Sequence, residues 1–221
     1  MFPISQSYSQ EFTDTNPTLT VSLNSDNSFV YEDSDGHTVV VGLIENNDPL
    51  SFITNVVIQA KFFDDFSSNP LEIKEGSAVL KVVPPNSAAP FIIRSENPNP
   101  NITDVSTKIL TFETSKFMEN SLNISVNNVS IAKIFDLSES VYDLSFSGML
   151  RNGNASSSDT AVHFAFYDVF NRIIQISTIE IGDIGINELV SFKLNEGITA
   201  SSVGFLLFSE SDQFYSDFKD V

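Results

Sequence analysis

The chain has 221 residues, 41% of them hydrophobic, with 20 Phe and no Trp. So much large apolar surface is untypical of a disordered chain and predicts packed cores. Lys and Arg number 11 against 29 Asp and Glu, which gives a formal net charge of −18. Because binding to phosphates relies on clustered Lys and Arg, this charge disfavours nucleic acid and anionic membranes as partners.

Cysteine is absent, which excludes disulfides, thiolate metal sites and cysteine nucleophiles. No apolar run approaches the ~20 residues that a membrane helix needs, so no transmembrane segment is expected. Residues 1–16 are predicted to be a leader. Ser7 and Ser9 have the small-x-small spacing of an export cleavage site, but a full hydrophobic region is missing, so an export-signal remnant and an ordinary leader both fit.

The two halves of the chain match in the order and spacing of their apolar segments. Leu19–Asn24 corresponds to Leu122–Asn127 at an offset of 122 − 19 = 103. The next segment carries Gly42 in the first half and Gly148 in the second, an offset of 148 − 42 = 106. Small drifts in the offset are typical of loop insertions and deletions in a duplicated domain.

The clearest strand of each half is Val56–Asp64, which corresponds to Thr160–Asp168. Apolar side chains alternate along both, with one face predicted to be core and the other mixed. Each copy shows about seven such segments, separated by Asn, Ser, Gly and Pro clusters, with no sustained helical periodicity. This pattern predicts an all-β protein of two tandem immunoglobulin-like Greek-key β-sandwiches.

The predicted domains are a sandwich over residues 17–115, a linker over 116–119 and a second sandwich over 120–221. Within them, the polar stretches 48–54 and 154–159 are predicted to be loops between strands. The acidic and aromatic tail after Glu210 is expected to pack back on the second sandwich.

The sequence Phe164–Asp168 (FAFYD) resembles the signature of the FxLYD family, with Phe166 in place of Leu. The first copy, Ala60–Asp64 (AKFFD), is similar but departs at its first position and has Phe in place of Tyr. The upstream Gly and Asn of each copy also look like that family. The resemblance implies small immunoglobulin-like domains on exported bacterial or archaeal proteins, and hence an extracytoplasmic, secreted or cell-surface location. It carries over no functional residue.

Residues for catalysis are scarce. The only histidines, His37 and His163, occupy non-equivalent places in the repeat, and no Gly-x-Ser-x-Gly elbow is present. We therefore predict no catalytic and no cofactor-binding residue and a chain that is not an enzyme, with a hydrolase of unrecognised site as the least favoured alternative.

The turn Glu32–His37 offers Asp33 and Asp35 as weak candidate ligands for calcium, which prefers hard oxygen donors. The loop is only half of an EF-hand pattern, because Tyr31 stands where an acid is needed and a closing glutamate is missing. An ordinary exposed turn is the favoured interpretation.

Asn-x-Ser/Thr sequons provide four candidate glycosylation sites: Asn101, Asn123, Asn128 and Asn154. Of these, Asn101 and Asn154 lie in predicted loops. Together these features predict a non-catalytic binding or structural module of the cell surface or envelope, which contacts a protein partner or assembles with itself. The alternative is a ligand-binding or calcium-binding accessory protein of the exterior space.

Overall fold

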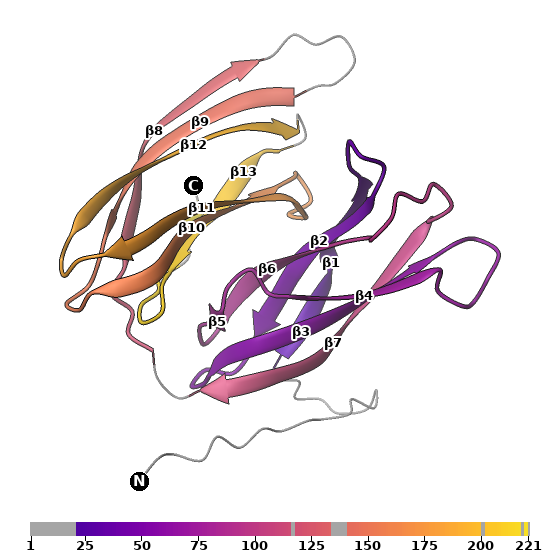
Figure 1. The fold of residues 1–221 in the computed structure, drawn as a ribbon, viewed down its shortest axis with the longest axis horizontal. Helices are drawn as coiled ribbons and strands as arrows, with labels where there is room; N and C mark the ends of the chain where they lie inside the picture. Colours follow the sequence, from indigo (N-terminus) through magenta and orange to yellow (C-terminus); the bar gives the residue numbers. More distant parts are fainter. Residues whose placement is uncertain (1–20, 116–117, 134–140, 200–201, 218, 221) are drawn as a thin grey trace. The chain divides into compact units, whose positions relative to one another are not determined.

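The computed structural model describes residues 21–115, 118–133, 141–199, 202–217 and 219–220. It divides into two compact units, Met1–Phe117 and Met118–Val221 (Figure 1). Within the described residues all regular structure is strand, and four antiparallel sheets pair as two sandwich-like domains. The predicted fold class is therefore confirmed. The predicted leader, residues 1–16, lies outside the described part of the chain.

The first unit contains two facing sheets, and the chain crosses between them more than once. One sheet has the order β1 (Val21–Glu32), β2 (Thr38–Asn46) and β6 (Ser87–Arg94). In the other, β3 is central and pairs with the three remaining strands: β3 (Phe52–Phe63), β4 (Glu72–Ser77), β5 (Val82–Val83) and β7 (Asp104–Ser115).

The second unit repeats this topology. Its first sheet has the order β8 (Asn123–Lys133), β9 (Val141–Arg151) and β12 (Leu189–Thr199). Its other sheet has the order β11 (Ile173–Ile184), β10 (Ser157–Tyr167), β13 (Gly204–Glu210) and β14 (Lys219–Asp220). Strands β8, β9 and β12 thus correspond to β1, β2 and β6, and β11, β10 and β13 to β4, β3 and β7. The repeat in the sequence is a repeat of strand pairing.

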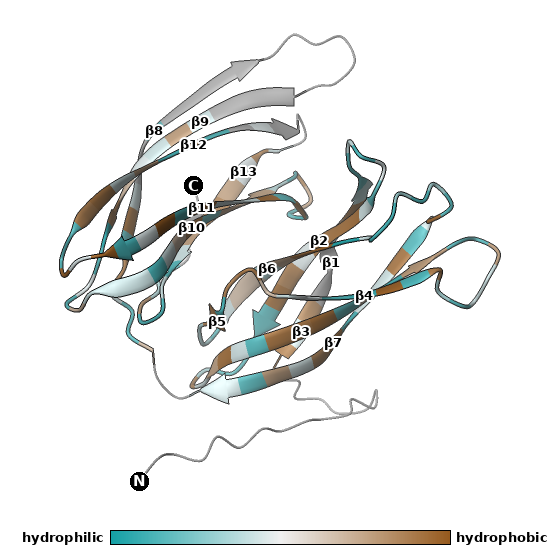
Figure 2. Cartoon of the chain, in the orientation of Figure 1, coloured by the Kyte–Doolittle hydropathy of each residue, from teal (hydrophilic) through white to brown (hydrophobic). Residues whose placement is uncertain are grey.

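The core of each unit lies between its two sheets, where apolar residues alternate along the central strands (Figure 2). On β3, Ile58, Ala60 and Phe62 are each 0% exposed, as the alternation predicts. In the second unit the ring of Phe146 lies 5.1 Å from that of Phe164. Burial of each such aromatic side chain contributes about 1.5–3 kcal/mol, so these strands hold the fold.

The predicted loops 48–54 and 154–159 were too long, because β3 begins at Phe52 and β10 at Ser157. Polar residues inside these strands mark bulges rather than turns. Asn55 and Asp159 lie at equivalent positions, 159 − 55 = 104, with φ of 51° and 50°, and the strand register shifts beside each. Asn and Asp tolerate the left-handed backbone that such a bulge needs, so a turn-like residue can continue a strand.

A glycine faces a phenylalanine across the same strand pair in both units. Gly42 pairs with Phe91, and Gly148 pairs with Phe192. A Cβ atom added at Gly42 would lie 2.7 Å from the Phe91 ring, and one at Gly148 would lie 2.3 Å from the Phe192 ring. The aromatic ring therefore occupies the space above each glycine.

We expect Gly42→Ala to destabilise the first unit by about 1–3 kcal/mol, since the ring of Phe91 must move to admit the methyl group. Denaturant unfolding of the full chain measures the effect. In the Gly42→Ala chain, Phe91→Leu should lower the free energy of unfolding by less than it does in the native chain, because it removes the clash with the ring and leaves only that with Ser28 Oγ. Purely additive effects would contradict this account of the pair.

Candidate functional site

The candidate calcium turn between β1 and β2 is organised around Asp33. Its Oδ1 accepts hydrogen bonds from the backbone N–H groups of Asp35 and His37, both at 3.0 Å. Its Oδ2 accepts one from Arg94 Nε at 2.5 Å, while Arg94 Nη2 donates to Asp35 Oδ2 at 2.9 Å. One guanidinium therefore bridges the two carboxylates that were predicted as weak calcium ligands.

The hydrogen bond from Arg94 lowers the pKa of Asp33 to about 2, and the backbone hydrogen bonds from His37 and Asp35 act in the same direction. A cation that bound here would have to compete with this guanidinium. Within the described residues, no three His, Cys, Asp or Glu side chains are grouped so that they could hold a metal ion. Calcium binding at Asp33 and Asp35 stays a prediction, and the contacts of Arg94 argue against it.

The depressed pKa of Asp33 makes a prediction for pH. A carboxyl that is more acidic in the folded state than in the unfolded one stabilises the fold above the unfolded value of 3.8, and this stabilisation is lost as the pH falls through about 2. Carboxyl titration by NMR should show the low pKa in the native chain and a return toward 3.8 in Arg94→Gln. An unchanged titration in Arg94→Gln would contradict the role of Arg94.

The two histidines are engaged in different ways. His37 Nδ1 lies 2.8 Å from the carbonyl oxygen of Ser95, which ties the β1–β2 turn to the end of β6. His163 is 4% exposed, with Nδ1 2.9 Å from Thr178 Oγ1 and Nε2 3.9 Å from Glu210 Oε1. Its ring also stacks on that of Phe208 at 5.2 Å. These contacts join β10 to both of its neighbours in the sheet.

A buried asparagine closes one end of each sandwich, a role that the sequence analysis missed. Asn46, 1% exposed, ends β2, and its Nδ2 lies within 3.1 Å of the carbonyl oxygens of Ser51, Val83 and Pro84. Val83 belongs to β5 in the opposite sheet. The two hydrogens of this amide are therefore shared among three carbonyl groups, and the amide ties both sheets together.

Asn152 does the same in the second unit. It is 2% exposed, and its Nδ2 lies within 3.1 Å of the carbonyl oxygens of Ala155, Ile184 and Gly185. The signal in the sequence was present, because Gly42 and Asn46 recur as Gly148 and Asn152 with the same spacing. The sequence analysis used it as part of the repeat and predicted loops after each asparagine, whereas the structure uses the asparagine as a cross-sheet clamp.

An aspartate caps the turn at the opposite end of each unit. Asp64 Oδ1 accepts from the backbone N–H groups of Phe66 and Ser67 at 3.0 and 2.8 Å. Asp168 Oδ1 accepts from those of Phe170 and Arg172 at 2.9 and 3.0 Å. This is the local capping that an aspartate provides through its own backbone.

In the second unit the Arg172 guanidinium also donates to Asp168 Oδ2, at 2.6 Å from Nη2 and 2.8 Å from Nε. Burial pushes the pKa of Asp168 up, but the hydrogen bonds from Arg172 and from the backbone outweigh burial and lower the pKa. Asp168 therefore stays ionised as a structural group at the turn.

A shallow depression of about 410 Å³ lies in the second unit. It occurs where β13 ends, and the backbone N–H of Ser158 donates there to Asp212 Oδ1 at 2.8 Å. Its lining combines polar side chains with one isoleucine and one glycine: Ser156, Ser157, Ser158, Asp183, Ile184, Gly185, Asp212 and Gln213. Beyond it the tail packs on its own unit, as expected, with Phe214 1% exposed.

The asparagines of the four sequons are all exposed. Asn101 lies in the turn between β6 and β7, and Asn154 in the bend between β9 and β10. Asn123 and Asn128 lie on β8, at the edge of its sheet. A modifying enzyme could therefore reach each of these side chains, and the loop positions offer the least hindered backbone.

The fold and these contacts define a protein of two immunoglobulin-like sandwiches. The sequence matches no family model and no curated protein. Among solved structures, the chain is similar to red sea bream transglutaminase at a TM-score of 0.32 and 12% identity, over 92% of this chain and 31% of that one. It spans about a third of that protein's length.

Two structures of β-glucuronidase 2 from Bacteroides uniformis are also similar. A calcium-binding mutant matches at a TM-score of 0.31 and 11% identity, over 87% of this chain and 27% of that one. The enzyme covalently bound to cyclophellitol-6-carboxylate aziridine matches at a TM-score of 0.32 and 11% identity, over 84% of this chain and 26% of that one. These low scores add nothing to what the strand pairing already establishes.

The clamp makes a prediction for stability. Asn46→Ala leaves three carbonyl groups without their donor and should cost at least about 2 kcal/mol in the unfolding of the first unit. The neighbouring Asn47→Ala is the matched control, because Asn47 Nδ2 donates only to Ser22 Oγ at an exposed position. Denaturant unfolding that shows equal losses for the two variants would contradict the clamp.

Proposed function

We propose that the chain is a non-catalytic module of the cell exterior, built from a tandem pair of FxLYD-type immunoglobulin-like domains, that binds a protein partner or assembles with itself. The observation that carries this proposal is the matching use of polar residues in the two copies. Asn46 and Asn152 clamp sheets, and Asp64 and Asp168 cap turns. These amide and carboxylate side chains therefore stabilise the same scaffold in both copies.

The FxLYD assignment draws on the motif residues. In the second copy Phe164 and Phe166 are core residues on β10, and Asp168 follows as the turn cap. In the first copy Phe62 and Asp64 take the same two roles despite the departures from the motif. The core phenylalanine and the capping aspartate of the motif therefore have the same roles in both copies.

An exported location agrees with the acidic surface and with the exposed sequons. A net charge of −18 keeps a protein dispersed in salty surroundings. Among the described residues, no helix is long and apolar enough to span a membrane.

Localisation in the source cells tests the proposal. We expect intact cells, or their medium, to expose the chain to added protease, while a cytoplasmic marker protein stays protected. Peptide mapping of the native chain by mass spectrometry should find glycan at Asn101 and Asn154 if the organism glycosylates exported proteins. Recovery of the full-length chain only after cell lysis would contradict the proposal.

A further inference from the structure

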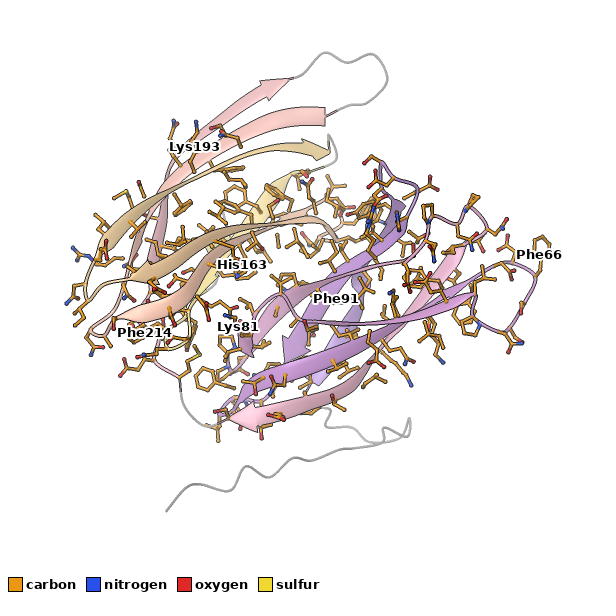
Figure 3. All side chains as sticks on the ribbon, in the orientation of Figure 1. Phe66, Lys81, Phe91, His163, Lys193 and Phe214 are labelled. Carbon is orange, nitrogen blue, oxygen red and sulfur yellow. The ribbon has the colours of Figure 1, made fainter. Side chains whose placement is uncertain are left out.

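Each unit displays a phenylalanine at the same loop tip. Phe66 lies between β3 and β4 and is 95% exposed, and Phe170 lies between β10 and β11 and is 71% exposed. Figure 3 shows Phe66 at the outer end of its loop. The two positions are equivalent, because 170 − 66 = 104 is also the offset between Asp64 and Asp168.

The backbone of both tips is held in place. The N–H of Phe66 donates to the Asp64 cap at 3.0 Å, and the N–H of Phe170 donates to the Asp168 cap at 2.9 Å. The ring is thus presented by an ordered turn, which lowers the entropy that a binding partner must remove. The ring itself contributes almost nothing to the fold when nearly all of its surface meets water.

The repeat makes this exposure informative. Other phenylalanines that recur in the two copies are buried, as Phe62 and Phe166 are on the central strands and Phe91 and Phe192 are over the glycines. Packing explains why those rings recur. It does not explain a ring that both copies expose, so the recurrence of Phe66 as Phe170 points to contact with another molecule.

The charge around Phe66 indicates the chemistry of that molecule. The loops at this end of the first unit are residues 32–38, 63–72 and 94–104, and Arg94 is their only Lys or Arg. Arg94 is already bound to Asp33 and Asp35, and Lys74 of β4 is already paired with Glu96 at 3.0 Å. The acidic residues of these loops are Glu32, Asp33, Asp35, Asp64, Asp65, Glu72, Glu96 and Asp104. An apolar tip within an acidic border complements an apolar pocket within a basic border.

We propose that Phe66 anchors the first unit in an apolar pocket bordered by Lys and Arg on a partner protein. This inference rests on the proposed binding function and names the class of partner. A second copy of this acidic chain would meet like charge at the same place, and an anionic membrane would repel it. Phe170 differs from Phe66, because the Arg172 guanidinium lies over its ring at 5.2 Å and pairs with Asp168, so the proposal is confined to the first unit.

A random peptide library displayed on phage, selected on the full chain at low salt, tests the inference. We expect the selected peptides to combine apolar residues with Lys or Arg. Fluorescence anisotropy with the synthetic peptides should show at least about tenfold weaker binding to Phe66→Ser. Leu50→Ser is the matched control, since Leu50 is 81% exposed in the loop at the other end of the same unit, and it should bind as the native chain does.

Several results would overturn the inference. They are a selection without basic peptides, equal peptide binding to Phe66→Ser and the native chain, and equal losses of peptide affinity in Phe66→Ser and Leu50→Ser.

Phe66-dependent binding to phosphatidylcholine vesicles would assign the tip to lipid, and Phe66-dependent dimers in sedimentation would assign it to a second copy. A large drop in the melting temperature of Phe66→Ser would show a structural role instead. A chain found outside the cytoplasm that selects no basic peptide would overturn this inference alone.

Discussion

The buried amide of Asn46, and that of Asn152 in the second copy, is the contact on which each sandwich depends. Two sheets packed only through apolar side chains can slide, because the hydrophobic effect has no direction. An amide that is carried at the end of one sheet and donates to a carbonyl oxygen of the other fixes their relative position at that end. It also satisfies backbone oxygens that the loop would otherwise bury without donors. The aromatic core then packs in one arrangement.

From this clamped end the strands run to loops that are free to vary. The two copies keep an aspartate cap there but differ in the rest, with the Asp33–Arg94–Asp35 bridge in the first and the Asp168–Arg172 pair in the second. Such a division is common in immunoglobulin-like scaffolds, where a rigid framework presents variable loops. Both copies also expose a phenylalanine at this end, Phe66 in the first and Phe170 in the second.

Much of the fold could be predicted because its signals are local. Alternation along β3 identified its core face, and the repeat identified the matching strands. On β10 the alternation was less informative, because His163 and Ala165 on its other face are buried as well, at 4% and 0% exposed. The candidate site was harder, since Asn46 and Arg94 act on groups about 37 and 61 residues away in the sequence. The strand starts near Asn55 and Asp159 were predicted too late for a related reason, because a bulge and a turn use the same left-handed backbone. Only tertiary pairing distinguishes them.

Hydrogen–deuterium exchange of the asparagine side-chain amides, followed by NMR on the full chain, tests the clamp most directly. Amides that are buried and bonded to carbonyl groups exchange only when the structure opens. The account predicts that the Nδ2 hydrogens of Asn46 and Asn152 exchange far more slowly than those of exposed asparagines such as Asn47 and Asn154. Equally fast exchange at all four residues would contradict the claim that these two amides hold the sandwiches together.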